Sequence, residues 1–190
     1  MHDSSFGVDT SDPRRVLASA TEQNSTPMTP ILVNACNTLF TGDAEFPAGN
    51  AFSTIDDVYR FTQLYRGRGT AGDLRYLSPA LFDYADRNHT GELTNDGWIF
   101  ETEARGMNPF PAHFCLLGGY VRGEGHVFTP AGLTASPRTI AVVGGGSTSF
   151  IVDPERDLTF VFLSAGFFTG LPHLQRVCRI NDLALATVND

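Results

Sequence analysis

The sequence contains no lysine, and all 13 of its basic side chains are arginines. Every mechanism that needs an ε-amine is therefore excluded for this chain by itself. Those mechanisms include Schiff-base chemistry, the phosphate-binding lysine of P-loops and nucleophiles of the Ser-x-x-Lys type. The exclusion does not depend on how the chain folds.

Cysteines are also few, and the histidines do not follow a metal-binding pattern. Cys36, Cys115 and Cys178 lie far apart and form no C-x-x-C, which argues against a disulfide framework. The five histidines show neither H-x-x-H nor H-E-x-x-H spacing. The glycines of residues 123–125 lack the strand and helix that flank a dinucleotide-binding loop. We therefore predict no metal and no cofactor.

Positive charge is in deficit, because the formal net charge is −8 at pH 7. Binding to nucleic acid or to anionic lipid needs clustered positive charge. The longest apolar run, residues 160–168, is far short of a bilayer span. The first 15 residues have neither the basic start nor the apolar stretch of a secretion signal. We predict no nucleic-acid partner, no membrane association and a cytoplasmic location.

The chain does have enough apolar side chain for a core, with 42% hydrophobic residues among 190. That length favours a single domain over residues 1–190. Residues 1–50 are rich in Ser, Thr, Pro, Gly and Asp and lack periodicity, so they are predicted to be loop-rich with one helical turn near residues 13–20. Loops this long usually lie on other structure. We therefore predict a partial domain that belongs to a larger fold.

Residues 53–87 are predicted to be helical. Ser53 can cap a helix whose first turn carries Asp56 and Asp57, where the helix dipole favours negative charge. An apolar stripe follows at helical spacing: Val58, Phe61, Leu64 and Tyr65. A second, short helix is predicted to begin at Ser78, because Pro79 suits the first helical position.

Residues 97–164 are predicted to form antiparallel strands. The expected strands lie at residues 97–103, 114–121, 139–143, 148–152 and 158–164. The last two are joined by DPERD and form a hairpin, since Pro and Asp favour a turn. Both arms are apolar almost without alternation, which indicates burial on both faces. A helix over residues 172–188 can cover one face, and something else must cover the other.

Four stretches together resemble the C-terminal part of the serine β-lactamase-like hydrolases, a group that includes class C β-lactamases, penicillin-binding-protein relatives and esterases or transacylases. They are MHDSSFGVD, GNAFSTIDDVYRFTQLYRGRG, LRYLSPALF and VVGGGSTSFIVDPERDLTFVFLS, in that order. The resemblance implies an α+β fold, with an antiparallel sheet flanked by helices. It also implies an ancestral reaction, the hydrolysis or transfer of an ester or amide acyl group by a serine nucleophile.

The motifs that carry this chemistry are missing or altered. The family uses Ser-x-x-Lys, then Tyr-x-Asn, then Lys/His-x-Gly; the first is impossible without lysine, and no tyrosine here is followed two places on by asparagine. The third aligns with Val142, Val143 and Gly144, and the backbone N–H of Gly145 matches one of two oxyanion-hole donors. We predict no catalytic residue, only a substrate-binding remnant at Val142, Val143, Gly144 and Gly145. A β-bulge or a close backbone contact is the alternative reason for the glycines of residues 144–146.

Two functions follow as alternatives. The chain is either a member of the hydrolase family that is inactive alone, or a non-catalytic binding or assembly module derived from that fold. In the first case the chain is either a truncated product or half of a site whose N-terminal half another polypeptide supplies. An uncovered sheet edge and apolar face would also favour self-association.

Overall fold

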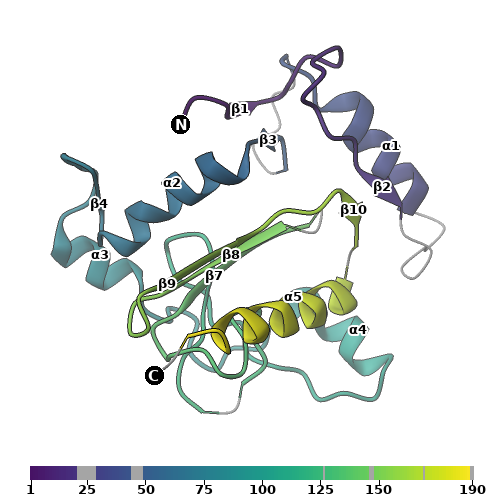
Figure 1. Ribbon diagram of the computed structural model, residues 1–190. Helices are drawn as coiled ribbons and strands as arrows, with labels where there is room; N and C mark the ends of the chain where they lie inside the picture. Colours follow the sequence, from purple (N-terminus) through teal and green to yellow (C-terminus); the bar gives the residue numbers. More distant parts are fainter. Residues whose placement is uncertain (21–28, 44–48, 126, 146–147, 169, 189–190) are drawn as a thin grey trace.

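The fold is built around a four-stranded antiparallel sheet in the order β6-β7-β8-β9. Its strands are β6 (Tyr120–Val121), β7 (Ile140–Gly144), β8 (Thr148–Asp153) and β9 (Leu158–Phe162). Helix α5 (Gly170–Leu185) covers one face and helix α2 (Ile55–Arg66) covers the other (Figure 1). The computed structural model describes residues 1–20, 29–43, 49–125, 127–145, 148–168 and 170–188.

The predicted hairpin is confirmed as β8 and β9, paired antiparallel from Ser149 opposite Phe162 to Asp153 opposite Leu158. Its turn is organised by Asp153, whose buried carboxylate accepts hydrogen bonds from the N–H groups of Ser136, Glu155 and Arg156. The Arg156 guanidinium pairs with the same carboxylate at 3.3 Å. The local DPERD sequence therefore forms the turn, and Ser136 ties it to a distant loop.

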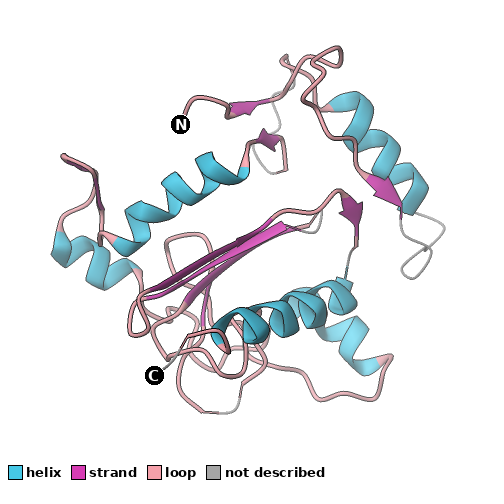
Figure 2. Cartoon of the chain, in the orientation of Figure 1, coloured by secondary structure: helices cyan, strands magenta, loops and turns pink. Residues whose placement is uncertain are grey.

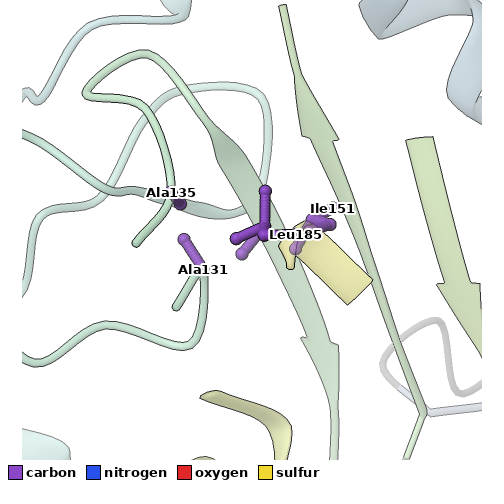
Figure 3. Close-up of a cluster of buried hydrophobic side chains, with 5 residues drawn as sticks. Ala131, Ala135, Ile151 and Leu185 are labelled. Carbon is purple, nitrogen blue, oxygen red and sulfur yellow. The ribbon is translucent and has the colours of Figure 1, made fainter. Parts of the chain in front are cut away.

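The face toward α5 carries the main apolar core. Ile151 of β8 is fully buried against Leu185 of α5, and the small residues Ala131 and Ala135 close the cluster from a neighbouring loop (Figure 3). A second cluster joins the start of α5 to the end of β7: Phe110, Leu171 and Leu174, with Trp98, Met107, Phe128 and Val143 against them. The predicted C-terminal helix is thus confirmed, with bounds 170–185 instead of 172–188.

The opposite face is covered by α2 of this same chain. Phe150 of β8 meets the rings of Phe61 and Tyr65 edge-on, at centroid distances of 6.2 and 5.4 Å. The helix that the sequence predicts around residues 53–66 therefore covers the second face of the hairpin. Its cap differs from the prediction, because the Thr54 hydroxyl, and not Ser53, accepts the Asp57 N–H. The short helix α3 (Pro79–Ala85) begins where predicted, with Pro79 in its first turn, and the Ser78 hydroxyl accepts the Leu81 N–H.

The strand predicted over residues 97–103 is wrong. The segment forms a 3-10 turn, Asp96–Trp98, followed by helix α4 (Ile99–Glu103). The Thr102 hydroxyl donates to the carbonyls of Trp98 and Ile99, and the Glu101 carboxylate accepts the Leu171 N–H at 2.8 Å. Contact with the start of α5 thus overrides the β propensity of the local sequence.

The strand predicted over residues 114–121 shortens to β6, because Cys115 N–H bonds the Gly119 carbonyl in a tight turn. Gly118 has φ +84, a conformation that suits glycine. Most of the chain between α4 and β7 is loop (Figure 2). The strand predicted at 139–143 is confirmed as β7.

The first 52 residues differ most from prediction. No helix forms over residues 13–20, whereas helix α1 (Thr29–Leu39) forms within the region predicted to be loop-rich. Within this part β1 (Ser5–Phe6) pairs with β3 (Ala51–Phe52), and the pairing of β2 (Ser19–Ala20) with β10 (Gly166–Phe167) ties it to the rest. A separate small hairpin joins β4 (Thr70–Ala71) and β5 (Leu74–Arg75).

Within the described residues, no helix has the length and hydropathy needed to cross a membrane. The three cysteines are free thiols.

Candidate functional site

The four residues predicted as a substrate-binding remnant lie at the end of β7. Val142 packs on the α2 face with Cys115 and Ile140, and Val143 packs on the α5 face with Leu171. Both side chains are therefore part of the core. Any contribution of this segment to binding has to come from its backbone.

The backbone of this segment has an open edge. Strand β6 pairs only with Ile140 and Ala141, so β7 continues beyond its neighbour. The Arg122 N–H bonds the Thr139 carbonyl, which shows that Thr139 faces β6. Because backbone groups alternate along a strand, Val143 presents its N–H and C=O on the same side, past the end of β6. An extended acyl chain can pair with such an edge.

The two described glycines have different surroundings. Gly144 is paired regularly with Thr148, and a side chain on Gly144 would collide with the Thr148 hydroxyl. Gly145 follows in the turn, and a methyl group added there would meet no atom within 4 Å. Gly144 is thus required by close packing, whereas the space around Gly145 is open. Gly146 lies outside the described residues.

A buried histidine of α5 supports the end of β7. The His173 Nε2 donates to the Gly144 carbonyl at 3.0 Å, since a carbonyl can only accept. Burial lowers the pKa of His173, and the positive charge of Arg176 lowers it further against the opposing effect of the Gly144 hydrogen bond. The ring is therefore held neutral. Sequence reasoning missed this residue, because an isolated histidine in a helix carries no motif.

Among the described residues near the sheet, no polar group forms a nucleophile hydrogen-bonded to a base. The ring nitrogens of His89, His113 and His173 that form hydrogen bonds each have a backbone carbonyl as partner, and none is bonded to a hydroxyl. Burial raises the pKa of the Cys115 thiol, and it raises the pKa of Cys178 to about 11. Both thiols are consequently protonated at neutral pH and poorly nucleophilic.

Metal chemistry has no support in the part of the chain that the structure describes. There, no three side chains from His, Cys, Asp or Glu come together in a group that could hold a metal ion. One candidate histidine, His126, lies outside the described residues.

The chain is similar to known proteins in sequence and in fold. The family model described as Beta-lactamase matches residues 1–182. A crystal structure of a β-lactamase from Mycobacterium bovis is similar, with a TM-score of 0.52 and 24% identity over 73% of this chain. This chain covers 45% of that protein, less than half of its length. No curated protein matches. Because the family model covers residues 1–182 and the fold is α+β, the chain belongs to the β-lactamase family.

Proposed function

We propose that this chain forms one wall of a β-lactamase-family acyl-transfer site, at the open edge of β7. The observation that carries the proposal is that, among the described residues, no strand pairs with Val143 on the β6 side and the space around Gly145 is open, where the family resemblance expects the third motif and an oxyanion donor. The Val143 backbone would pair with an extended acyl substrate, and the Gly145 N–H would polarise its carbonyl. The substrate class is an ester or amide.

We propose further that the chain alone does not turn over such a substrate. It has no lysine to accept the proton of an attacking serine. A single oxyanion donor without a nucleophile does not amount to acyl transfer. The nucleophile and its base would come from a polypeptide that supplies the N-terminal half of the site.

Strand β9 supports this partner proposal, because it ends the sheet and its outer edge has no strand beside it in the described structure. Nearby, the Arg176 guanidinium stacks over the rings of Phe162 and Phe168, at 5.4 and 4.9 Å from their centroids. Its Nε and Nη2 atoms are buried and lack acceptors among the described residues. An extended segment that pairs with β9 and brings a carboxylate to Arg176 would complete the sheet edge and give the guanidinium an acceptor.

The activity test uses nitrocefin and p-nitrophenyl acetate with the purified chain. We expect no hydrolysis above background and no covalent adduct with benzylpenicillin by mass spectrometry. Robust turnover that a point substitution in this chain abolishes would contradict the proposal that the site is incomplete.

The binding test follows backbone amides by NMR during titration with benzylpenicillin. We expect saturable shifts of the Val143 and Gly145 amides, and none at Ile140, which faces away from the edge. A response spread equally over β7, or none at all, would rule out binding at this edge.

A non-catalytic binding or assembly module is the second candidate. It is favoured by the third motif, whose charged or aromatic first residue in the family is replaced here by valine. The side chains of Val142 and Val143 pack as core residues. Neighbouring reading frames that encode Ser-x-x-Lys and Tyr-x-Asn would favour the hydrolase, and their absence would favour the module. Sedimentation tests self-association: we expect dimers, and a stable monomer would count against them.

A further inference from the structure

A second polar region lies at the opposite end of β7 from Gly145. It is a cavity of about 610 Å³, within the size range of small-molecule sites. Val121 and Pro137 contribute apolar wall, and charged side chains line the remainder: Arg68, Asp83, Asp86, Arg87, Glu92, Glu124 and Arg138. Because residues 137 and 138 precede the strand and Gly145 follows it, this cavity is separate from the acyl-transfer edge.

His113 lies in the wall of this cavity, with a buried side chain and an unusual backbone conformation. The residue is 2% exposed, and its φ of +50 is rare for a residue other than glycine. Its Nδ1 lies 3.2 Å from the Arg122 carbonyl, which can only accept, so Nδ1 carries the proton. The Nε2 atom of the neutral ring therefore has a free lone pair. It is buried and has no hydrogen-bond partner among the described residues.

The group nearest to this lone pair is another acceptor. The Glu92 Oε1 lies 3.9 Å from His113 Nε2, and Glu92 itself is 88% exposed. Two acceptors at this separation cannot satisfy each other while the ring is neutral, but one donor between them can reach both at hydrogen-bond distance. The arrangement therefore lacks a hydrogen-bond donor.

The charges around the cavity favour a cationic donor. Arg138 is paired with Asp86 at 2.6 Å, and Arg68 is paired with Asp83, so these charges are balanced within the wall. Glu92 and Glu124 form no ion pair with an arginine in the described structure, and Arg87, whose guanidinium donates to the Asp83 carbonyl, offsets one of these two charges, so the lining keeps a net charge of −1. A negative potential thus remains beside the His113 lone pair.

We propose that this cavity binds a small primary ammonium compound, which donates one N–H to Nε2 of His113 and another to the Glu92 carboxylate. A tetrahedral ammonium group has enough protons to serve both acceptors, and its organic part would lie against Val121 and Pro137. A divalent metal fits less well, because a zinc site uses three or four protein ligands and, among the described residues, no group of three potential ligands comes together.

The test uses chain labelled with ¹⁵N-histidine and titrated with ethylammonium chloride, with sodium chloride holding the ionic strength constant. Long-range ¹H–¹⁵N spectra report which nitrogen of His113 carries the proton. We expect the proton on Nδ1 in the free chain and a saturable shift of Nε2 with ethylammonium. A proton on Nε2 in the free chain, or no saturable shift, would overturn the proposal.

Two further ligands show whether a shift of the Nε2 resonance requires an N–H donor. Tetramethylammonium chloride has no N–H to donate, so it should leave Nε2 unchanged. Zinc chloride should not displace ethylammonium at equimolar concentration. An equal response to tetramethylammonium, or displacement by zinc, would contradict an N–H donor site.

The variant Glu92→Gln removes one charge-assisted hydrogen bond and should weaken ethylammonium binding by about tenfold. Glu92 is exposed, so the fold should tolerate this change. Glu103→Gln is the matched control, because Glu103 is an exposed glutamate outside the cavity, and its affinity should equal that of the unmodified chain. Equal affinities for Glu92→Gln and Glu103→Gln would overturn the assignment of Glu92.

Discussion

Two regions of this molecule are held together by different forces. The sheet and α5 contain fully buried apolar side chains, among them Ile151, Leu171 and Val177, each with 0% exposure. Residues 1–52 leave large apolar side chains exposed, including Val16, Ile31 and Leu32. The first region therefore has a core of its own, whereas the second is attached to it.

The attachment of the N-terminal region is largely polar. The Asp57 carboxylate of α2 accepts the N–H groups of His2 and Asp3 and the hydroxyl of Ser4. The Ser19 N–H donates to the Ala165 carbonyl at 2.8 Å. Net hydrogen-bond energies are modest beside the burial of large apolar side chains. The comparison indicates that the N-terminal region can detach while the sheet stays folded.

The largest expected effect comes from removing a side chain at the centre of the sheet. Ile151→Ala should lower the free energy of unfolding by about 2–5 kcal/mol, because it leaves a cavity between β8 and α5. Leu32→Ala, at an exposed position on α1, should change it by less than about 0.5 kcal/mol. Urea unfolding measures both, and equal losses would abolish the distinction between the regions.

The next effect tests the turn that closes the hairpin. Asp153→Asn should destabilise the chain by about 1–3 kcal/mol, because an amide cannot replace the charged acceptor for Ser136 N–H and Arg156. The matched change is Asp157→Asn, which breaks only an exposed pair with Arg66 and should cost below about 1 kcal/mol. A larger loss for Asp157→Asn would show that the turn depends on the surface pair.

A smaller effect concerns the pH dependence of stability, to which His173 contributes. Burial lowers the pKa of this histidine below its ordinary value of 6.5, so the unfolded chain binds a proton first as the pH falls. Its contribution to stability is complete above about pH 6.5 and declines as the pH approaches the folded pKa. Denaturant unfolding at several pH values should show this decline in the unmodified chain and a weaker one in His173→Gln. Parallel pH profiles would contradict a buried neutral ring.

The smallest effect on global stability concerns the N-terminal tether. Burial tends to raise the pKa of Asp57, but the Asp3 N–H, the Ser4 hydroxyl and the His2 N–H lower it to about 2, against the ordinary 3.8. The tether is thus fully present above about pH 4 and is lost as the pH falls through about 2.

Asp57→Asn should imitate this loss at neutral pH. We expect faster hydrogen exchange at the amides of His2 and Asp3, with exchange at Ile151 unchanged. Asp56→Asn, a change beside it in the first turn of α2, is the control. Faster exchange throughout the sheet would mean that the two regions unfold together.

Local sequence determined the elements that are stabilised by interactions between residues close together in the chain. The absence of lysine excluded amine chemistry, the DPERD turn predicted the β8–β9 hairpin, and Ser78 with Pro79 predicted the start of α3. The apolar spacing after residue 172 predicted α5. These features depend on backbone preferences and side-chain periods that act within a few residues.

Only the tertiary structure decided the rest. Residues 99–103 became a helix because Glu101 meets the start of α5, 70 residues further along the chain. The open edge of β7 exists because β6 begins only at Tyr120, opposite Ala141, and the contact of His173 with Gly144 spans 29 residues. Packing of distant segments sets such contacts, and no local pattern records which segments will meet.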